Sequence, residues 1–262
     1  MTAPLSPADL HAALDAAVAA VRAAGGLLLD LQNRPLEVAG DFAHDIKLIA
    51  DQRSEALILE TLAARFPLPV LTEETGEHGP LDPDSLMWVV DPLDGTFNYF
   101  RSMPCCCSCV GLVHAGRPVL GAVYDFFSGR LFTGIAAEGA WLNGKPIRCS
   151  AVVEPAQAAL ATGFPHHFDY SSPSLNAFVR RVRGFKKIRM LGSAALMAAY
   201  VAAGWFDVYL EDDIWLWDVA AASAIALGAG AHLELSQGSA GPWAREIVLS
   251  STPALADALR KI

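Results

Sequence analysis

Apolar side chains recur at helical spacing in two stretches near the start of the chain. From Pro7 to Leu31 they return every three or four residues, and Ser6 with Asp9 is typical of a capping box at a helix start. Asp51–Phe66 repeats the pattern, and two prolines then precede the short apolar run Val70–Thr72. The pattern predicts two amphipathic helices, the second followed by a strand.

The next segments are shorter and separated by turn signals, which is typical of strands. From Met87, four apolar residues precede Asp-Pro-Leu-Asp-Gly, which indicates a buried strand that ends in a turn. Glycine-containing pairs then separate three further stretches, which we expect to form an antiparallel meander: Cys107–His114, Pro118–Phe126 and Arg130–Ile135.

The second half of the chain has a different pattern. Alanine-rich helical stretches at Ser193–Gly204 and Val219–Leu227 alternate with short apolar runs at Val208–Glu211 and His232–Leu235. We therefore expect residues 1–262 to form a single unit with two lobes, an α+β lobe at 1–150 and an α/β lobe at 151–262.

Composition identifies a folded chain. Of its 262 residues, 53% are hydrophobic and 18% are charged, which excludes a disordered polymer. The longest uncharged stretch, between Arg189 and Asp207, contains glycine, serine and tyrosine and suits a buried helix better than a membrane span. No basic patch precedes an apolar run at the N-terminus. We expect no secretory signal, no membrane partner and a cytoplasmic location.

The charge of the chain limits its ligands. A net charge of −9 disfavours binding to a nucleic acid polymer, because such binding depends on lysine and arginine contacts to backbone phosphates. A small phosphorylated ligand can still bind if divalent cations supply the missing positive charge.

Four of the five cysteines are clustered, at Cys105, Cys106, Cys107 and Cys109. Adjacent residues of a strand point to opposite faces, so consecutive cysteines do not converge on one ion, and no second cysteine or histidine cluster completes a tetrahedral set. This favours small apolar residues on a buried strand over a metal or redox site.

Acidic residues follow three of the apolar runs. Glu73 follows Val-Leu-Thr, Asp91 and Asp94 follow Met-Trp-Val-Val, and Asp218 follows Trp-Leu-Trp. Hard divalent cations such as Mg²⁺ take oxygen ligands of this kind. A lone Asp-Gly pair is more often a turn or helix cap, but three acidic clusters together favour a metal site.

The spacing within the central cluster supports this interpretation. Two aspartates three residues apart, with a proline between them, can turn both carboxylates and the Leu93 carbonyl toward one point. Gly95 and Thr96 then open a predicted helix, whose free backbone N–H groups favour an anion such as phosphate.

Several motifs together resemble the inositol monophosphatase family, within the lithium-sensitive, magnesium-dependent phosphatase superfamily. They are DIKLIADQRSE, TEE, WVVDPLDGTFNY, GSAAL and WDVAAASAIALGAGA, and they are spread over most of the chain. The resemblance implies an α+β fold, the layered αβαβα sandwich of the inositol monophosphatase and fructose-bisphosphatase type, acting as a single catalytic unit.

The resemblance also implies a centre of two or three Mg²⁺ ions. Glu73, Asp91 and the Leu93 carbonyl would hold one ion, while Asp91, Asp94 and Asp218 would hold a second. A third, weaker ion would share Glu73.

Catalytic and substrate-binding residues follow from the same resemblance. Hydrolysis would use metal-activated water, with Glu73 catalytic as a metal ligand and the Thr96 hydroxyl, oriented by Asp51, helping to position and deprotonate the water. The substrate would be contacted by six residues: Gly95, Thr96, Gly192, Ser193, Ala194 and Glu211.

The substrate itself stays open among several phosphate monoesters. Inositol monophosphate is the leading class, and the alternatives are a 3'-phosphoadenosine nucleotidase, a histidinol-phosphatase or a sugar bisphosphatase. Asp212 and Asp213 follow Glu211, so we expect a second phosphate to be repelled there, and Trp205 and Trp215 to narrow the site. A non-catalytic relative is a remote alternative, and a homodimer is expected by resemblance.

Other polar residues are weaker candidates. His166 and His167 lie in a polar stretch, where we expect a solvated or rim role, and His44 is expected to make a loop contact. Lys47 either approaches the phosphate or is a surface lysine at a strand edge.

Overall fold

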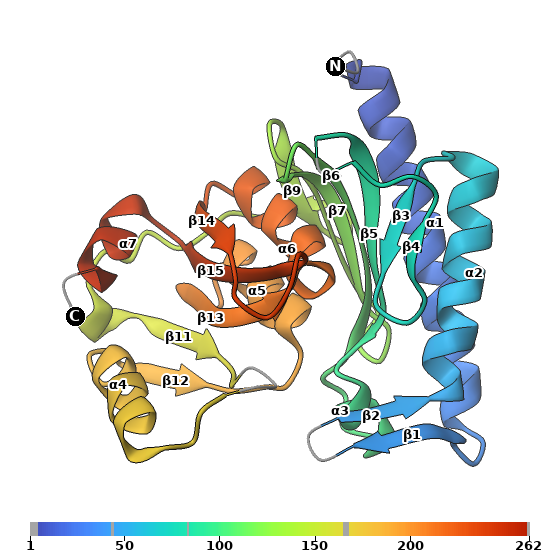
Figure 1. The fold of residues 1–262 in the computed structure, drawn as a ribbon. Coiled ribbons are helices and arrows are strands. Elements are labelled where there is room, and N and C mark those ends of the chain that lie inside the picture. The colour runs from blue at the N-terminus through green and yellow to red at the C-terminus, as the bar shows by residue number, and fades with distance from the viewer. Residues whose placement is uncertain (1–4, 43–44, 83, 165–167, 261–262) are drawn as a thin grey trace.

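The structure is a computed structural model that describes residues 5–42, 45–82, 84–164 and 168–260 (Figure 1). The weak candidates His44, His166 and His167 lie outside these residues. The helices of the described residues are α1 Pro7–Gln32, α2 Ile49–Arg65, α3 Thr96–Phe100, α4 Ser172–Val182, α5 Ala194–Ala202, α6 Leu216–Gly228 and α7 Pro253–Leu259, with a 3₁₀ turn η1 at Pro155–Gln157.

The larger sheet has the strand order β10-β9-β8-β7-β6-β5-β3-β4. Its neighbouring strands are antiparallel except β3 and β5, which run parallel. The strands are β3 Val70–Thr72, β4 Gly76–His78, β5 Leu86–Asp94, β6 Cys107–His114, β7 Arg117–Asp125, β8 Arg130–Ile135, β9 Gly139–Leu142 and β10 Lys145–Pro146.

The smaller sheet has the order β12-β11-β13-β15-β14, and β1 pairs with β2 in a separate hairpin. The pairs β12–β11 and β11–β13 are parallel, and the other two pairs are antiparallel. The strands are β11 Ala159–Thr162, β12 Lys187–Arg189, β13 Val208–Trp215, β14 His232–Gln237 and β15 Ala244–Ser250, with β1 Val38–Phe42 and β2 Asp45–Leu48.

Helices and sheets alternate in layers, which confirms the predicted α+β sandwich (Figure 1). Helices α1 and α2 cover the outer face of the larger sheet, α5 and α6 lie between the two sheets, and α4 and α7 lie on the far side of the smaller sheet. The predicted boundary between residues 150 and 151 lies between the last strand of one sheet and the first strand of the other. The division into two lobes stays a prediction.

Helix α1 begins at the predicted capping box. The Asp9 backbone N–H donates to the Ser6 hydroxyl oxygen, and the Ser6 N–H donates to the Asp9 carboxylate. The helix is long and apolar enough to cross a membrane by length and composition. However, one face is buried against the larger sheet through alanines such as Ala13 and Ala17, and the core helix of a globular protein passes the same test.

Three glycines let α6 lie directly on the larger sheet. Gly111, Gly121 and Gly134 are paired in a row across β6, β7 and β8. A Cβ added at Gly121 would lie 2.7 Å from the Ala221 Cα, and one at Gly134 would lie 2.6 Å from the Ile225 Cα. Real Cβ contacts are not this short, so only glycine permits this approach of helix backbone to sheet backbone. The first turn of α6 carries Asp218.

One predicted boundary is wrong. We expected the strand that begins near Met87 to end before Asp91, but β5 continues to Asp94. Its pairing with β6 slips between the two aspartates, since Asp91 pairs with Cys109 and Asp94 with Cys107. One extra residue on β5 forms a β-bulge, which lets the strand continue through a segment whose residue types indicate a turn.

Candidate active site

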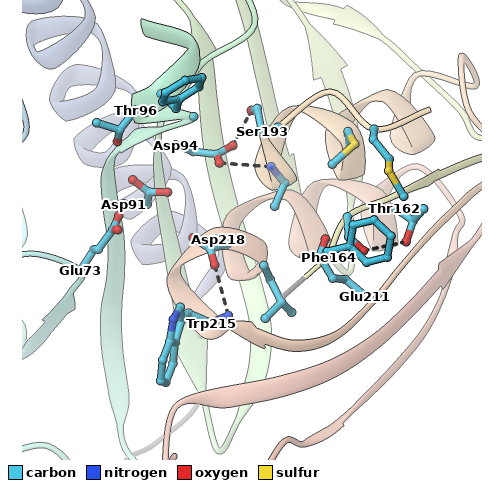
Figure 2. Close-up of a pocket in the computed structure, with 18 of the residues that line it drawn as sticks. Glu73, Asp91, Asp94, Thr96, Thr162, Phe164, Ser193, Glu211, Trp215 and Asp218 are labelled. Carbon is cyan, nitrogen blue, oxygen red and sulfur yellow. Dashed lines mark hydrogen bonds between the residues drawn. The ribbon is translucent and has the colours of Figure 1, made fainter. Parts of the chain in front are cut away.

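A cavity of about 480 Å³ opens between the two sheets (Figure 2). Of the residues that the sequence predicts for the site, all but Asp51 line this cavity: Glu73, Asp91, Leu93, Asp94, Gly95, Thr96, Gly192, Ser193, Ala194, Glu211 and Asp218. Sequence reasoning missed several further lining residues, which carry no motif of their own: Phe97, Thr162, Gly163, Phe164, Met190, Met197 and Ile214.

Three carboxylates converge at one end of this cavity. Glu73, Asp91 and Asp218 each place an oxygen within 4.8 Å of the others. Glu73 follows β3 directly, and because Thr72 pairs with Val90 in the parallel β3–β5 pair, Glu73 lies next to Asp91. Asp218 approaches from the first turn of α6. Figure 2 shows the Glu73 and Asp91 side chains pointing toward each other, with Asp218 nearby.

The bulge in β5 explains why Asp91 and Asp94 line the same cavity. In a regular strand, residues three apart point to opposite faces. The extra residue shifts this alternation by one position, so both aspartates line the cavity. The sequence spacing indicated the shared direction, and the bulge provides it.

Asp94 turns away from the other three carboxylates and toward α5. Its Oδ1 accepts from the Ala194 N–H at 3.1 Å, and its Oδ2 accepts from the Ala195 N–H at 2.8 Å and from the Ser193 hydroxyl. The carboxylate therefore caps the N-terminus of α5, where the free N–H groups and the helix dipole favour a negative charge. Glu73, Asp91 and Asp218 form a trio without it.

Thr96 and Asp51 are joined by a hydrogen bond. The Thr96 hydroxyl lies 2.9 Å from Asp51 Oδ1 and also 2.9 Å from the Leu93 carbonyl oxygen. The other oxygen of Asp51 accepts from the Leu48 N–H at 2.8 Å, at the start of α2. Asp51 is buried behind Thr96 and is fixed by these two contacts.

Burial raises the pKa of every carboxyl in this group. Desolvation, followed by a smaller contribution from Glu74, raises the pKa of Glu73 to about 8. Desolvation likewise raises the pKa of Asp51 to about 7, although hydrogen bonds from Leu48 and Thr96 oppose the shift. Asp91, Asp94 and Asp218 also have raised pKa values, caused first by desolvation. Bound cations would remove both the desolvation penalty and the mutual repulsion.

A second buried acid holds the segment that carries Glu73. Glu55, one turn after Asp51 on α2, is 2% exposed and accepts hydrogen bonds from the Glu74 N–H at 3.1 Å, the Thr75 hydroxyl at 2.5 Å and the Thr72 hydroxyl. Glu55 therefore fixes the backbone on both sides of Glu73.

Lys47 lies near the site but faces an acid. Its Nζ is 3.1 Å from Glu74 Oε1, and the Glu74 side chain is 6% exposed while that of Lys47 is 34% exposed. Lys47 does not line the cavity. We expected Lys47 either to approach the phosphate or to be a surface lysine at a strand edge, and neither expectation included the ion pair with Glu74.

The cavity lining around Glu211, away from the acidic trio, differs from what the sequence predicted. Of the three consecutive acids, only Glu211 and Asp213 line the cavity, because alternate residues of a strand point to opposite faces. The Asp212 side chain is 55% exposed, and its carboxylate lies 2.7 Å from the guanidinium of Arg181. Trp215 lines the cavity, whereas Trp205 packs beside Tyr200 elsewhere. The predicted cluster of three acids and the narrowing by Trp205 are therefore wrong.

The donor set fits hard divalent cations. Within the described part of the chain, the cavity lining contains no lysine, arginine or histidine, while the acidic trio supplies clustered carboxylate oxygens. Mg²⁺ binds such oxygens and leaves other positions for water and phosphate. An anionic ligand would be repelled from this end of the cavity unless cations were bound there.

A layered sandwich with buried carboxylates beside a cavity between its sheets defines a class of metal-dependent phosphatases, and the comparisons with known proteins agree. The family model for the inositol monophosphatase family matches residues 9–262. The chain belongs to this family, which is a family of phosphoric monoester hydrolases.

Individual relatives cover most of the chain. It is similar to an inositol-1-monophosphatase of Synechocystis sp., with 35% identity over 86% of this chain and 79% of that protein. It is equally similar to Nus factor SuhB of Escherichia coli, with 35% identity over 84% of each chain. Among solved structures, inositol monophosphatase from Anabaena superposes with a TM-score of 0.83 at 33% identity, covering 96% of this chain and 95% of that one.

Proposed function

We propose that this protein hydrolyses a small phosphate monoester with the help of Mg²⁺. The observation that carries the proposal is the trio Glu73, Asp91 and Asp218, whose oxygens lie within 4.8 Å of one another in a cavity of a phosphatase fold. These three residues and the Leu93 carbonyl would hold two or three ions, with Asp94 as a further ligand if one of its oxygens is released from α5. Bound Mg²⁺ would lower the pKa of a coordinated water and offset phosphate charge.

The chain's own residues can move a proton beside the ions. The Thr96 hydroxyl donates to Asp51 Oδ1 at 2.9 Å, so its oxygen keeps a lone pair that can accept a proton from water. As Thr96 accepts that proton, it can pass its own to Asp51. Without bound cations the pKa of Asp51 is about 7, and cations would lower it, which leaves Asp51 ionised and able to accept this proton near neutral pH.

Inositol monophosphate is the first substrate to test, because relatives carry that activity in their names. Gly95, Thr96 and the segment 192–194 line the cavity beside the acids, where we propose that they contact the substrate. A 3'-phosphoadenosine nucleotidase, a histidinol-phosphatase and a sugar bisphosphatase remain the alternatives. Cytoplasmic location and sensitivity to lithium are further proposals that rest on the family resemblance.

Phosphate release tests the proposal. The panel is inositol 1-phosphate, 3'-phosphoadenosine 5'-phosphate, histidinol phosphate and fructose 1,6-bisphosphate, each with Mg²⁺ and with EDTA. Glu73→Gln should lower the Mg²⁺-dependent rate by about 100-fold or more, while the matched control Glu60→Gln, on the exposed face of α2, should not. Full activity of Glu73→Gln would contradict the proposed metal centre.

The name of several relatives suggests a second role. Proteins from Salmonella, Escherichia and Xylella that are 35% identical to this chain are called Nus factor SuhB. A protein-binding role beside catalysis is therefore a second candidate, and we still propose no direct binding to a nucleic acid polymer because the net charge is −9. If a strain with the inactive Glu73→Gln protein grows normally while a strain that lacks the gene does not, the result would favour this protein-binding role.

A homodimer is proposed from the family resemblance, and several large apolar side chains are exposed. Phe97 of α3, Val179 of α4, Ile188 of β12 and the adjacent Met190 are 61%, 54%, 37% and 46% exposed. In Figure 1, α4 and β12 lie at the lower left and α3 lies at the lower right. Sedimentation should give a dimer, and Val179→Asp should weaken it.

A further inference from the structure

The side chain of Asn98 reaches from α3 to the segment that precedes α5. Its amide nitrogen lies 2.7 Å from the Leu191 carbonyl oxygen and 3.2 Å from that of Gly192. The same nitrogen lies 2.7 Å from the Cys105 carbonyl oxygen, so three carbonyls share its two N–H groups. The opposite orientation of the amide would place its oxygen against all three carbonyl oxygens, so the nitrogen is the atom that faces them.

Asp94 holds the same segment through backbone atoms of the opposite polarity. Its carboxylate accepts from the N–H groups of Ala194 and Ala195 at the start of α5 (Figure 2). Asn98 therefore binds two carbonyls, and Asp94 binds two N–H groups, of one continuous stretch of chain. We call residues 191–195 the clamped segment, and part of it lines the cavity.

The clamped segment is in close backbone contact with the turn at Gly95. A Cβ added at Gly95 would lie 3.0 Å from the Gly192 carbonyl oxygen, and one added at Gly192 would lie 3.1 Å from the Asn98 amide nitrogen. Both distances are shorter than ordinary Cβ contacts, so glycine at each position permits this approach. With so little space between them, a displacement of one backbone is passed directly to the other.

The two contacts respond differently to cations. Asp94 can become a metal ligand only if one of its oxygens is released from α5, and that release removes an acceptor from N–H groups of the clamped segment. The nitrogen of a side-chain amide is a donor and does not bind Mg²⁺, so the bonds from Asn98 to the carbonyls of residues 191 and 192 are kept. Asn98 is thus suited to hold the clamped segment while Asp94 turns toward an ion.

We propose that Asn98 is a positioning residue whose N–H groups hold the clamped segment at the cavity and so set the affinity for the alcohol part of the substrate. The inference rests on the proposed phosphatase function, in which residues 192–194 contact the substrate beside Gly95 and Thr96. The donor atoms matter because three carbonyl oxygens would lose their partner without them. Binding of the ester should therefore depend on Asn98 more than binding of inorganic phosphate does.

Two substitutions separate hydrogen bonding from packing. Asn98→Asp keeps the shape of the side chain but places an oxygen against the three carbonyl oxygens, whereas Asn98→Ala removes the side chain beyond Cβ. If the donor holds the clamped segment, Asn98→Asp should loosen it more than Asn98→Ala, and a packing role predicts the reverse order. The matched control is Asn176→Asp, the same chemical change on the exposed surface of α4.

Amide hydrogen exchange in EDTA measures this loosening without metal or substrate. Relative to the N–H groups of α1, those of residues 194–197 should exchange at least about 10-fold faster in Asn98→Asp, less so in Asn98→Ala, and at the unmodified rate in Asn176→Asp. Unchanged exchange in Asn98→Asp, or a larger increase in Asn98→Ala, would overturn the inference. An equal increase in both segments would show a general loss of stability and would also overturn it.

Steady-state kinetics test the effect on the substrate. With saturating Mg²⁺, KM of Asn98→Ala for the fastest ester of the panel should rise about 10-fold, while kcat and the inhibition constant of inorganic phosphate should change less than about twofold. An equal rise in KM and in the inhibition constant, or a lower kcat with unchanged KM, would overturn the assignment to the alcohol part. Absence of turnover in the unmodified protein would instead refute the phosphatase proposal, and hydrogen exchange would still decide whether Asn98 positions the clamped segment.

Discussion

Replacing Gly121 by alanine should displace α6 from the larger sheet and, with it, Asp218. Gly121 faces the helix backbone at Ala221, and the added Cβ would lie 2.1 Å from the Ala221 carbonyl oxygen and 2.7 Å from the Ala221 Cα. Ordinary contacts of a Cβ begin near 3.4 Å, and both sides of this contact are backbone. The clash cannot be relieved by rotating a side chain, so the helix or the sheet must move.

The size of the effect follows from this geometry. Bringing the 2.1 Å contact with the Ala221 carbonyl oxygen to 3.4 Å requires a shift of about 1.3 Å, and overpacking of this kind costs about 1–3 kcal/mol of unfolding free energy. Asp218 lies about one turn before Ala221 on α6, so it moves with the helix. A misplacement of about 1 Å near reacting groups can lower the rate about 100-fold. We therefore expect a moderate loss of stability and a larger loss of activity.

Two measurements separate these effects. Urea denaturation in EDTA reports the stability of the fold without metal, and calorimetric titration with Mg²⁺ reports the geometry of the acidic trio. The matched control is Gly26→Ala on α1, where nothing lies within 4 Å of the added Cβ. It should increase stability by up to about 1 kcal/mol through helix propensity and leave Mg²⁺ affinity unchanged.

The result that would refute this reasoning is a Gly121→Ala protein with the denaturation midpoint and Mg²⁺ affinity of the unmodified protein. A destabilised variant with normal Mg²⁺ affinity would confirm the clash but show that it does not position Asp218.

Three further predictions concern the buried acids. In EDTA, stability should fall as pH rises from about 5 to 8, because the folded state keeps protons on Asp51 (pKa about 7) and Glu73 (pKa about 8) that the unfolded state has released. The slope is about 1.4 kcal/mol per pH unit for each such proton, thermal unfolding measures it, and a stability that increased over this range would contradict it. Thr96→Val should lower the rate about 100-fold or more while Thr96→Ser retains activity, and equal rates would exclude a role for the hydroxyl. Glu55→Ala should cost about 2 kcal/mol in urea denaturation and weaken Mg²⁺ binding, since three donors near Glu73 lose their acceptor; unchanged Mg²⁺ affinity would show that Glu55 does not position Glu73.

The sequence by itself determined the elements and the family. The long helix α1, the strand Cys107–His114 and the strand Arg130–Ile135 agree closely with their predicted ranges, because helical and alternating patterns are local properties of the chain. The family resemblance is confirmed over residues 9–262, and with it the layered sandwich. The DPLDGT motif can be recognised from sequence because adjacent residues combine a strand end with closely spaced carboxylates.

Tertiary structure decided which side chains meet and how they are used. The bulge in β5 brings Asp91 and Asp94 to one cavity, yet Asp94 turns to cap α5, whose N–H groups are brought to it from a distant part of the chain. The contacts of Glu55, and the cavity lining that includes Phe164, likewise join segments that no local pattern connects. Sequence spacing fixes directions within one element, whereas distances between elements depend on packing, such as the close approach of α6 over its row of glycines.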